Sequence, residues 1–134
     1  MKSGVLTVAI LAAMVGMYAV LADGQTEETR QEISGQVIRI VDGDGLYIAG
    51  HEPQIRLLGI DAPERNEIGY HASGAHLESL VLGEEITCEI MDVDRYGRTV
   101  GRCHADGAGD IGAVMIKDGQ AEEFLRYSNG YYSR

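Results

Sequence analysis

Positive charge is scarce in this chain of 134 residues, which has 11 Lys and Arg against 21 Asp and Glu and a net charge of −10. A protein that grips many phosphates of a duplex is normally basic, because neutralising the backbone supplies most of the affinity. The shortage of cations therefore excludes an extended duplex-binding face. It leaves room for local action on one or two phosphates, with a bound cation offsetting the protein's own carboxylates.

Internal repeats, low-complexity segments and histidine clusters are also absent from the sequence. The four histidines lie in a turn, on different faces of one predicted helix, and alone on a predicted strand (His51, His71, His76 and His104). A zinc site needs several such ligands at close spacing, and a histidine base needs a partner that orients it. Neither arrangement is expected here.

An uncharged, apolar segment opens the chain, running from Ser3 to Ala22 between Met1-Lys2 and Asp23. A positive start, an apolar stretch and a small-residue exit predict a secretory signal over residues 1–22. The stretch of about 20 residues is also nearly long enough to span a bilayer, so an uncleaved anchor that tethers the protein through residues 3–22 is the alternative. Both interpretations predict an exported protein, periplasmic or secreted. Loss of Lys2 with a cleaved signal would bring the net charge near −11.

The chain has only two cysteines, Cys88 and Cys103. They flank a turn near Tyr96-Gly97, in two segments with the pattern of antiparallel strands. Pairing through either Arg95–Tyr96 or Tyr96–Gly97 puts both thiols on the same side of the sheet, directly opposed or one step diagonal. We expect a disulfide if the cysteines are directly opposed or the strands adjust. Two buried free thiols are the alternative.

The polar and apolar patterns predict one α+β domain over residues 33–134, after an acidic linker at 23–32 that has no apolar residue. Strands are expected from residue 33 to a turn at 42–45, then at 46–48, 54–60, 86–93 and 99–105. Helices are expected around 72–81 and at 111–118, the second capped by Asp110. Hairpin-connected strands with a helix between the third and fourth are typical of a small five-stranded barrel of the oligonucleotide/oligosaccharide-binding (OB) type, with one to three short helices.

The first run of chemical interest is a sharp turn in which Asp42 and Asp44 alternate with Gly43 and Gly45. Asp-Gly is common in hairpin turns for backbone reasons alone, and that is the alternative to a functional site here. A helix–loop–helix calcium site is excluded. It would need a third acidic ligand in step and a glutamate at the twelfth position, where this chain has Pro53.

The second run extends from Arg56 to Glu64. Arg56 shares a predicted strand face with Ile60, so its guanidinium must reach a mouth of the barrel or find a partner. Asp61 and Glu64 flank a strand-ending Pro63, which stiffens the turn so that the two carboxylates converge on one side. Two unrelated surface carboxylates around a proline are the alternative.

The third run, Asp94-Arg95-Tyr96-Gly97-Arg98, is expected at the end of a hairpin. Guanidiniums bind phosphate oxygens through two parallel hydrogen bonds and never deprotonate, so they suit a developing dianion. Taken alone, the run would more often be a solvated turn. It gains weight from following the other two in this order.

Together the three runs resemble the staphylococcal-nuclease-like (thermonuclease) family, and the resemblance covers about residues 33–132. It implies an OB barrel with helices and a calcium-dependent endonuclease. The reaction implied is hydrolysis of DNA or RNA, single-stranded or locally opened, with little base specificity and with 3′-phosphate products. Relatives generally continue into a further C-terminal helix where this chain ends at Arg134. We therefore expect that helix to be missing and part of the barrel's apolar surface to lack its cover.

The resemblance also implies a metal and water site. Asp44 and Asp61 match the carboxylates that ligate calcium, and the carbonyl of Ala62 matches a backbone ligand. Oxygen-only ligation is what calcium prefers. Glu64 matches the glutamate that activates or positions the attacking water, and the sequence leaves those two roles open.

Five further residues take substrate-facing roles by the same resemblance. Arg56 and Arg98 match the arginines that clamp the reacting phosphate and stabilise its transition state. Arg95 and Tyr96 match neighbours of the substrate's terminal phosphate, and Tyr127 matches a tyrosine that lines the nucleotide pocket.

Two other functions stay open at this point. A non-catalytic OB barrel that binds a nucleic acid, a glycan or a protein partner would be consistent with the acidity and with the fold's many uses. A membrane-tethered structural protein rests only on the apolar start. No obligate protein partner is evident from the sequence.

Overall fold

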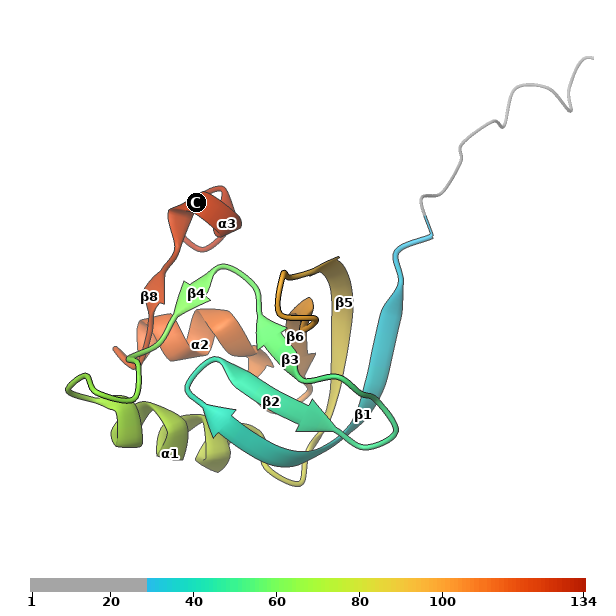
Figure 1. The fold of residues 1–134 in the computed structure, drawn as a ribbon, viewed down its shortest axis with the longest axis horizontal. Helices are drawn as coiled ribbons and strands as arrows, with labels where there is room; N and C mark the ends of the chain where they lie inside the picture. Colours follow the sequence, from blue (N-terminus) through green and yellow to red (C-terminus); the bar gives the residue numbers. More distant parts are fainter. Residues whose placement is uncertain (1–28) are drawn as a thin grey trace, which may run out of the picture.

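A closed five-stranded barrel forms the body of the protein in the computed structural model, which describes residues 29–134 (Figure 1). The predicted signal or anchor at 1–22 and residues 23–28 of the predicted linker lie outside the described residues. The barrel strands are β1 (Glu32–Asp42), β2 (Gly45–Ile48), β3 (Ile55–Leu57), β5 (Glu85–Val93) and β6 (Thr99–Ala105). Antiparallel pairing gives the order β3-β2-β1-β5-β6, and parallel pairing of β3 with β6 closes it. The predicted OB-type barrel is confirmed.

Three helices and three short strands complete the domain: α1 (Tyr70–Val81), α2 (Ile111–Lys117), α3 (Leu125–Ser128), β4 (Ile60–Asp61), β7 (Gly109–Asp110) and β8 (Glu122–Glu123). The cap of α2 is as predicted, because the Asp110 carboxylate accepts a hydrogen bond of 3.0 Å from the Ala113 N–H. Strand β4 pairs with β8 in a second small sheet, and α3 follows directly. Within the described part of the chain, no helix combines the length and apolar character needed to cross a bilayer.

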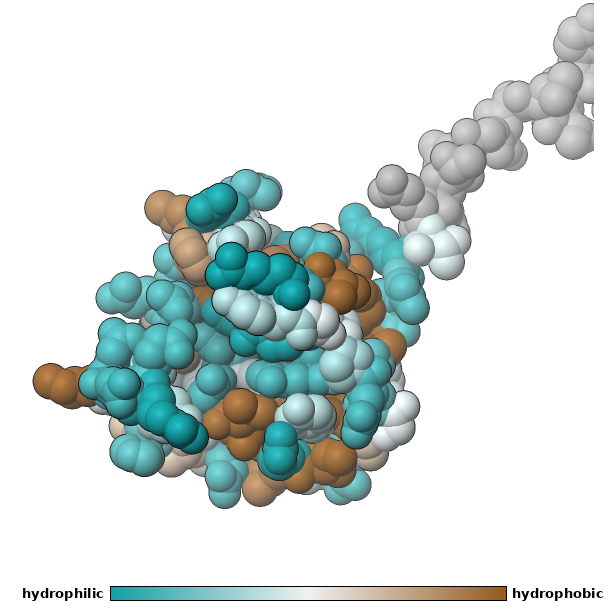
Figure 2. All heavy atoms as spheres, viewed as in Figure 1, coloured by the Kyte–Doolittle hydropathy of each residue, from teal (hydrophilic) through white to brown (hydrophobic). Residues whose placement is uncertain are grey.

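The hydrophobic core fills the barrel and the space between the barrel and helices α1 and α2. Its largest fully buried side chains come from every barrel strand but β6, from β4 and from helices α1 and α2 (Val37, Leu46, Ile48, Ile55, Leu57, Ile60, Leu77, Ile86, Ile111 and Met115). Figure 2 shows that one outer face is mainly hydrophilic, with hydrophobic side chains in small groups. Burial of alternate strand residues against two helices therefore holds the site-bearing loops in place.

The predicted third strand at 54–60 is interrupted, and this corrects the expectation about its two faces. Strand β3 ends at Leu57, Gly59 has a φ of +73°, and β4 begins at Ile60. A side chain at position 59 would be strained by that φ and would place its Cβ 2.7 Å from the Ser128 Cβ. The turn resets the alternation, so Ile60 enters the core instead of sharing a face with Arg56.

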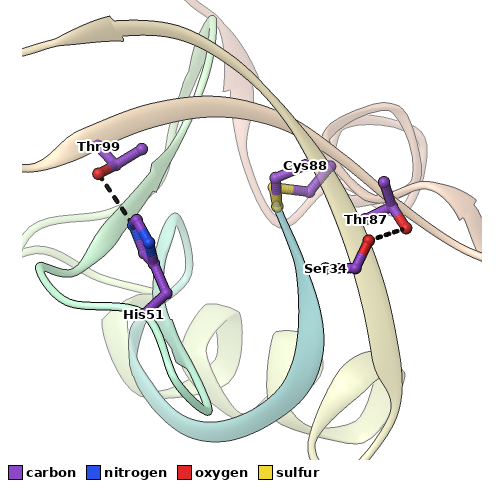
Figure 3. Close-up of a disulfide and its surroundings, with 6 residues drawn as sticks. Ser34, His51, Thr87, Cys88 and Thr99 are labelled. Atoms are coloured by element: carbon purple, nitrogen blue, oxygen red, sulfur yellow. Dashed lines mark hydrogen bonds between the residues drawn. A yellow bond between two sulfur atoms is a disulfide. The ribbon is translucent and has the colours of Figure 1, made fainter. Parts of the chain in front are cut away.

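A disulfide joins Cys88 to Cys103, which are directly opposed on β5 and β6 with a Cα–Cα distance of 4.0 Å (Figure 3). Both cysteines belong to the core, with exposed fractions of 0% and 2%. The hairpin register shifts by one residue between Ile90 and Asp92, so the pairing near its tip differs from both predicted registers. The shift lies between the tip and the cysteines and leaves them opposed. The predicted bridge is confirmed, and the alternative of free thiols is excluded.

We expect the variant that carries both Cys88→Ala and Cys103→Ala to lose about 3 kcal/mol of unfolding free energy, the value typical of a loop of about 15 residues. The bridge closes a separation of 15 residues, and its loss frees the unfolded chain more than the folded one. Urea unfolding followed by circular dichroism measures the change. The wild type unfolded in reductant serves as a control that keeps both side chains. Equal urea midpoints for oxidised wild type and the double variant would contradict the prediction.

Candidate active site

A buried ion pair lies where the Asp42–Gly45 turn meets β3. Arg56 Nη2 lies 3.1 Å from Asp44 Oδ2, and the same oxygen accepts a hydrogen bond of 2.9 Å from the Ala62 N–H. Arg56 also donates to the carbonyls of Leu57 and Ile60, at 2.8 and 2.9 Å. The partner that the sequence required for this guanidinium is therefore Asp44. These contacts leave the Arg56 Nε–H without a partner among residues 29–134.

Burial raises the pKa of Asp44 to about 7. The charge of Arg56 and the Ala62 N–H oppose that rise, whereas the neighbouring carboxylate of Asp42 adds to it. Asp42 also accepts a hydrogen bond from the Asp44 N–H at 3.2 Å, so the two acids are held together by the turn itself. Gly43 makes this packing possible, because a Cβ there would collide with the side chains of Ser73 and Ala62. The turn thus carries a desolvated carboxylate that further positive charge would stabilise.

The tip of the β5–β6 hairpin holds a second carboxylate–guanidinium pair. Asp94 Oδ2 accepts a hydrogen bond of 2.7 Å from Arg98 Nε, and Oδ1 accepts from the backbone N–H groups of Tyr96 and Arg98. Partial burial raises the pKa of Asp94, but these hydrogen bonds outweigh it and hold the pKa below its usual value. Because Asp94 engages only Nε, and no other contact of Arg98 within residues 29–134 involves them, its two terminal nitrogens are left for a ligand. Arg95 donates to the Tyr96 hydroxyl at 2.7 Å.

An open cleft of about 570 Å³ lies between this hairpin tip, the β3–β4 segment and α3. Figure 1 shows the tip, β4 and α3 on the same, upper side of the barrel, with α1 on the lower side. The cleft brings together five of the predicted site residues (Arg56, Arg95, Tyr96, Arg98 and Tyr127). They come from three segments that are distant in sequence, so the fold assembles this set.

The predicted metal and water residues Asp44, Asp61, Ala62 and Glu64 do not line the cleft. Ala62 is buried against Asp44, and Asp61 is exposed on β4. Glu64 is exposed in the loop before α1, where its backbone N–H donates to the Glu67 carboxylate at 2.9 Å. The structure therefore joins Asp44 to Arg56 directly and Ala62 to Arg56 through Asp44. The orientation of Asp61 and Glu64 toward them stays a prediction.

The donors near Asp44 fit a hard divalent cation in their chemistry. Asp44, Asp61 and the Ala62 carbonyl offer oxygen alone, which suits calcium. The raised pKa of Asp44 indicates a carboxylate that a cation would stabilise. Over residues 29–134, no group of three or more His, Cys, Asp or Glu side chains gathers closely enough to hold a metal ion. A cation here would take two carboxylates and a backbone oxygen, as the sequence predicts.

The cleft carries an excess of positive charge, whereas the whole protein is acidic. Four arginines line it, and only two aspartates do (Arg56, Arg95, Arg98, Arg126, Asp92 and Asp94). The full chain carries ten more acids than bases. Positive charge is therefore concentrated at one place, which suits local contact with phosphates and agrees with the exclusion of an extended duplex-binding face.

Sequence reasoning missed two cleft residues, Phe124 and Arg126, which lie beside Tyr127 on the α3 side. Phe124 is the only phenylalanine in the chain and is partly exposed, and its ring packs edge-on against Tyr127 at 4.8 Å. An exposed aromatic–basic run near the end of the chain was the available signal. The prediction of Tyr127 rests on the family resemblance and does not use this run.

Comparison with known proteins places this architecture in a family. The family model described as "Staphylococcal nuclease homologue" matches residues 54–134, more than half of the chain. The match covers β3, the hairpin tip and α3, so it contains every cleft residue. The chain therefore belongs to the staphylococcal nuclease family.

Individual relatives agree with this assignment. Over 99 residues the chain is 32% identical to an uncharacterized endonuclease of Escherichia coli O157:H7, covering 72% of this chain and 65% of that protein. Over 106 residues it is 30% identical to the micrococcal nuclease of Shigella flexneri, covering 72% and 61%. Over 90 residues it is 34% identical to a probable staphylococcal-like nuclease of Oryza sativa subsp. japonica, covering 66% and 27%. The chain spans less than two thirds of the length of each of these relatives.

Proposed function

We propose that this protein is an exported, calcium-dependent endonuclease that hydrolyses phosphodiester bonds of DNA or RNA with little base specificity and leaves 3′-phosphate ends. The observation that carries the proposal is the cleft in which Arg56 and Arg98 lie together, with Asp44 held against Arg56 at 3.1 Å. Membership of the family and the names of its relatives support the nuclease activity. The apolar start of the sequence supports export.

In such a reaction the two arginines of the cleft and Glu64 have different roles. Arg98, aligned by Asp94, and the free Nε–H of Arg56 contact the phosphate oxygens and take up the negative charge that develops as water attacks. Glu64 accepts a proton from that water or orients it. The bond from phosphorus to the 5′ oxygen breaks, the phosphate stays on the 3′ side, and the 5′ oxygen takes up a proton.

A calcium ion would be held by Asp44, Asp61 and the Ala62 carbonyl. When bound, it supplies positive charge that polarises a phosphoryl oxygen. Arg56 fixes the position of Asp44 from the other side, and the aromatic rings of Tyr96 and Tyr127 offer faces for bases. Because every base has a flat face, stacking of this kind discriminates little between bases, in keeping with low specificity.

Digestion assays with the purified, oxidised protein test the proposal. We expect both plasmid DNA and RNA to be cut in calcium, cutting to stop in excess chelator, and activity to return when calcium is restored. The Glu64→Gln variant, which keeps the size of the exposed side chain, should cut neither substrate at a comparable rate. Folded protein that cuts neither DNA nor RNA in calcium would leave a non-catalytic binding barrel as the remaining function. Products with 5′-phosphate ends would contradict the proposed direction of cleavage.

A further inference from the structure

Arg126 differs from the other arginines of the cleft in having no hydrogen-bonded or ion-paired partner within residues 29–134. Arg56 is held by Asp44, and Arg98 by Asp94. Arg95 donates to the Tyr96 hydroxyl. Arg126 is exposed, with its guanidinium 5.8 Å from the centre of the Tyr127 ring. A cation that lines a cleft without a partner in an acid-rich protein is available for an anionic ligand.

The segment that carries Arg126 is firmly tied to the barrel, although α3 has only four residues. The Phe124 N–H donates to the Gly59 carbonyl at 2.8 Å, and buried Ser128 donates to Glu123 Oε1 at 2.6 Å. Gly59 packs so closely under Ser128 that a side chain there would clash. Together these contacts hold the backbone around Arg126 in a fixed place relative to the β3–β4 segment, so the guanidinium is presented on the wall of the cleft.

The cations of the cleft come from different walls. Arg98 lies on the hairpin tip, Arg56 on β3 and Arg126 on α3. Asp44 and two carbonyls occupy most of the Arg56 guanidinium. Arg56 and Arg98 together form the predicted reaction centre. A nucleic acid strand carries its phosphates at regular intervals, and one phosphate cannot contact every wall of the cleft at once. The arrangement thus provides for a second phosphate on the α3 side.

We propose that Arg126 binds a phosphate of the substrate strand other than the one that Arg56 and Arg98 hold. Such a contact would favour a strand over an isolated phosphodiester. The proposal rests on the proposed nuclease function and adds a substrate contact to it. Arg126 acts on affinity and leaves the chemistry to the reaction centre.

Binding and cleavage of a labelled single-stranded hexanucleotide test this role. Binding is measured by fluorescence anisotropy in calcium, in a Glu64→Gln background so that the strand stays intact. We expect Arg126→Gln to raise Kd by about fivefold to tenfold and to reduce the slope of log affinity against log salt by about 0.7, as for one lost phosphate contact on a single strand. In otherwise wild-type protein, KM should rise by a similar factor while kcat changes by less than about twofold.

Arg39→Gln is the matched control. Arg39 is also an exposed arginine over a tyrosine, 4.4 Å from the Tyr47 ring centre, but it does not line the cleft. We expect it to change neither Kd nor the salt slope. Combining Arg126→Gln with Arg98→Ala should multiply their separate effects on Kd, because the two arginines hold different phosphates.

Each result decides one of the two proposals. If the protein cuts nucleic acid but Arg126→Gln binds the hexanucleotide like Arg39→Gln, the role of Arg126 is overturned and the nuclease function stands. A combined effect no larger than that of Arg98→Ala alone would overturn the second phosphate. If neither the wild type nor any variant cuts nucleic acid, but Arg126→Gln still weakens binding and reduces the salt slope as expected, the nuclease function is overturned and the phosphate contact of Arg126 stands. Absence of binding in a protein that does cut overturns the role of Arg126 alone, and absence of both binding and cutting overturns both proposals.

Discussion

Arg98→Ala should lower the rate of phosphodiester cleavage by about 10²-fold, the loss typical of removing one donor to a developing oxyanion. Among the described residues, Arg98 is the arginine of the cleft whose two terminal nitrogens have no partner while its Nε is aligned by a carboxylate, at 2.7 Å from Asp94 Oδ2. A guanidinium aligned in this way needs no reorganisation when charge develops on the phosphate. Steady-state cleavage of a short fluorescent oligonucleotide in calcium gives kcat and KM for each variant.

Asp94→Asn is the informative companion variant, because it keeps Arg98 and removes the charge that aligns it. We expect a smaller loss of kcat than for Arg98→Ala, since the guanidinium remains but its orientation is less restricted. The substitution also weakens the two hydrogen bonds that Oδ1 accepts from backbone N–H groups, because the acceptor loses its charge. Circular dichroism should therefore accompany the kinetics, to check that the hairpin tip stays folded. An unchanged rate in Arg98→Ala would remove Arg98 from the mechanism, whatever the companion does.

Arg56→Leu should destabilise the fold by about 3–5 kcal/mol, the range for breaking a buried ion pair at one partner. Asp44 is 6% exposed, and its carboxylate accepts a hydrogen bond from the Ala62 N–H. The carboxylate therefore cannot move into solvent without disturbing the 42–45 turn. The carbonyls of Leu57 and Ile60 would lose their donor as well. Urea unfolding at pH 9, above the raised pKa of Asp44 and without added calcium, measures the loss with the carboxylate charged and free of any cation effect.

The double variant Arg56→Leu with Asp44→Asn separates this account from simple loss of packing. If the cost of Arg56→Leu comes from an unpaired buried charge, then neutralising Asp44 should recover part of it. A double variant less stable than Arg56→Leu by the full cost of Asp44→Asn alone would show that the two side chains do not depend on each other. Both variants should be inactive, because they alter the predicted reaction centre.

The barrel strands could be predicted because each residue pattern had a local cause. Asp-Gly pairs mark the turn before β2, and Asp110 supplies the cap that starts α2. The parity of residue numbers placed Cys88 and Cys103 on one face of a hairpin, although it could not choose between direct and diagonal opposition. The register shift between Ile90 and Asp92 is a property of the folded hairpin that no count along the chain contains.

The interrupted third strand shows what local patterns leave out. The sequence pattern predicted one strand from 54 to 60, but the chain turns at Gly59, where Ser128 of α3 packs against it. That contact joins segments separated by more than sixty residues, so it becomes visible only when the fold is complete. Phe124 and Arg126 were missed for the same reason, since their place on the cleft depends on this contact.

The pairing of β4 with β8 sets Asp61 opposite Glu122, two residues before Phe124. One short ladder thus connects the residue predicted to face the cation with the wall predicted to face the bases. Under the proposed function, a cation that orders Asp61 would also order this wall and so reduce the entropy lost when a nucleotide binds. Cation and nucleotide would then favour each other's occupancy by the same factor, as reciprocity of coupled equilibria requires.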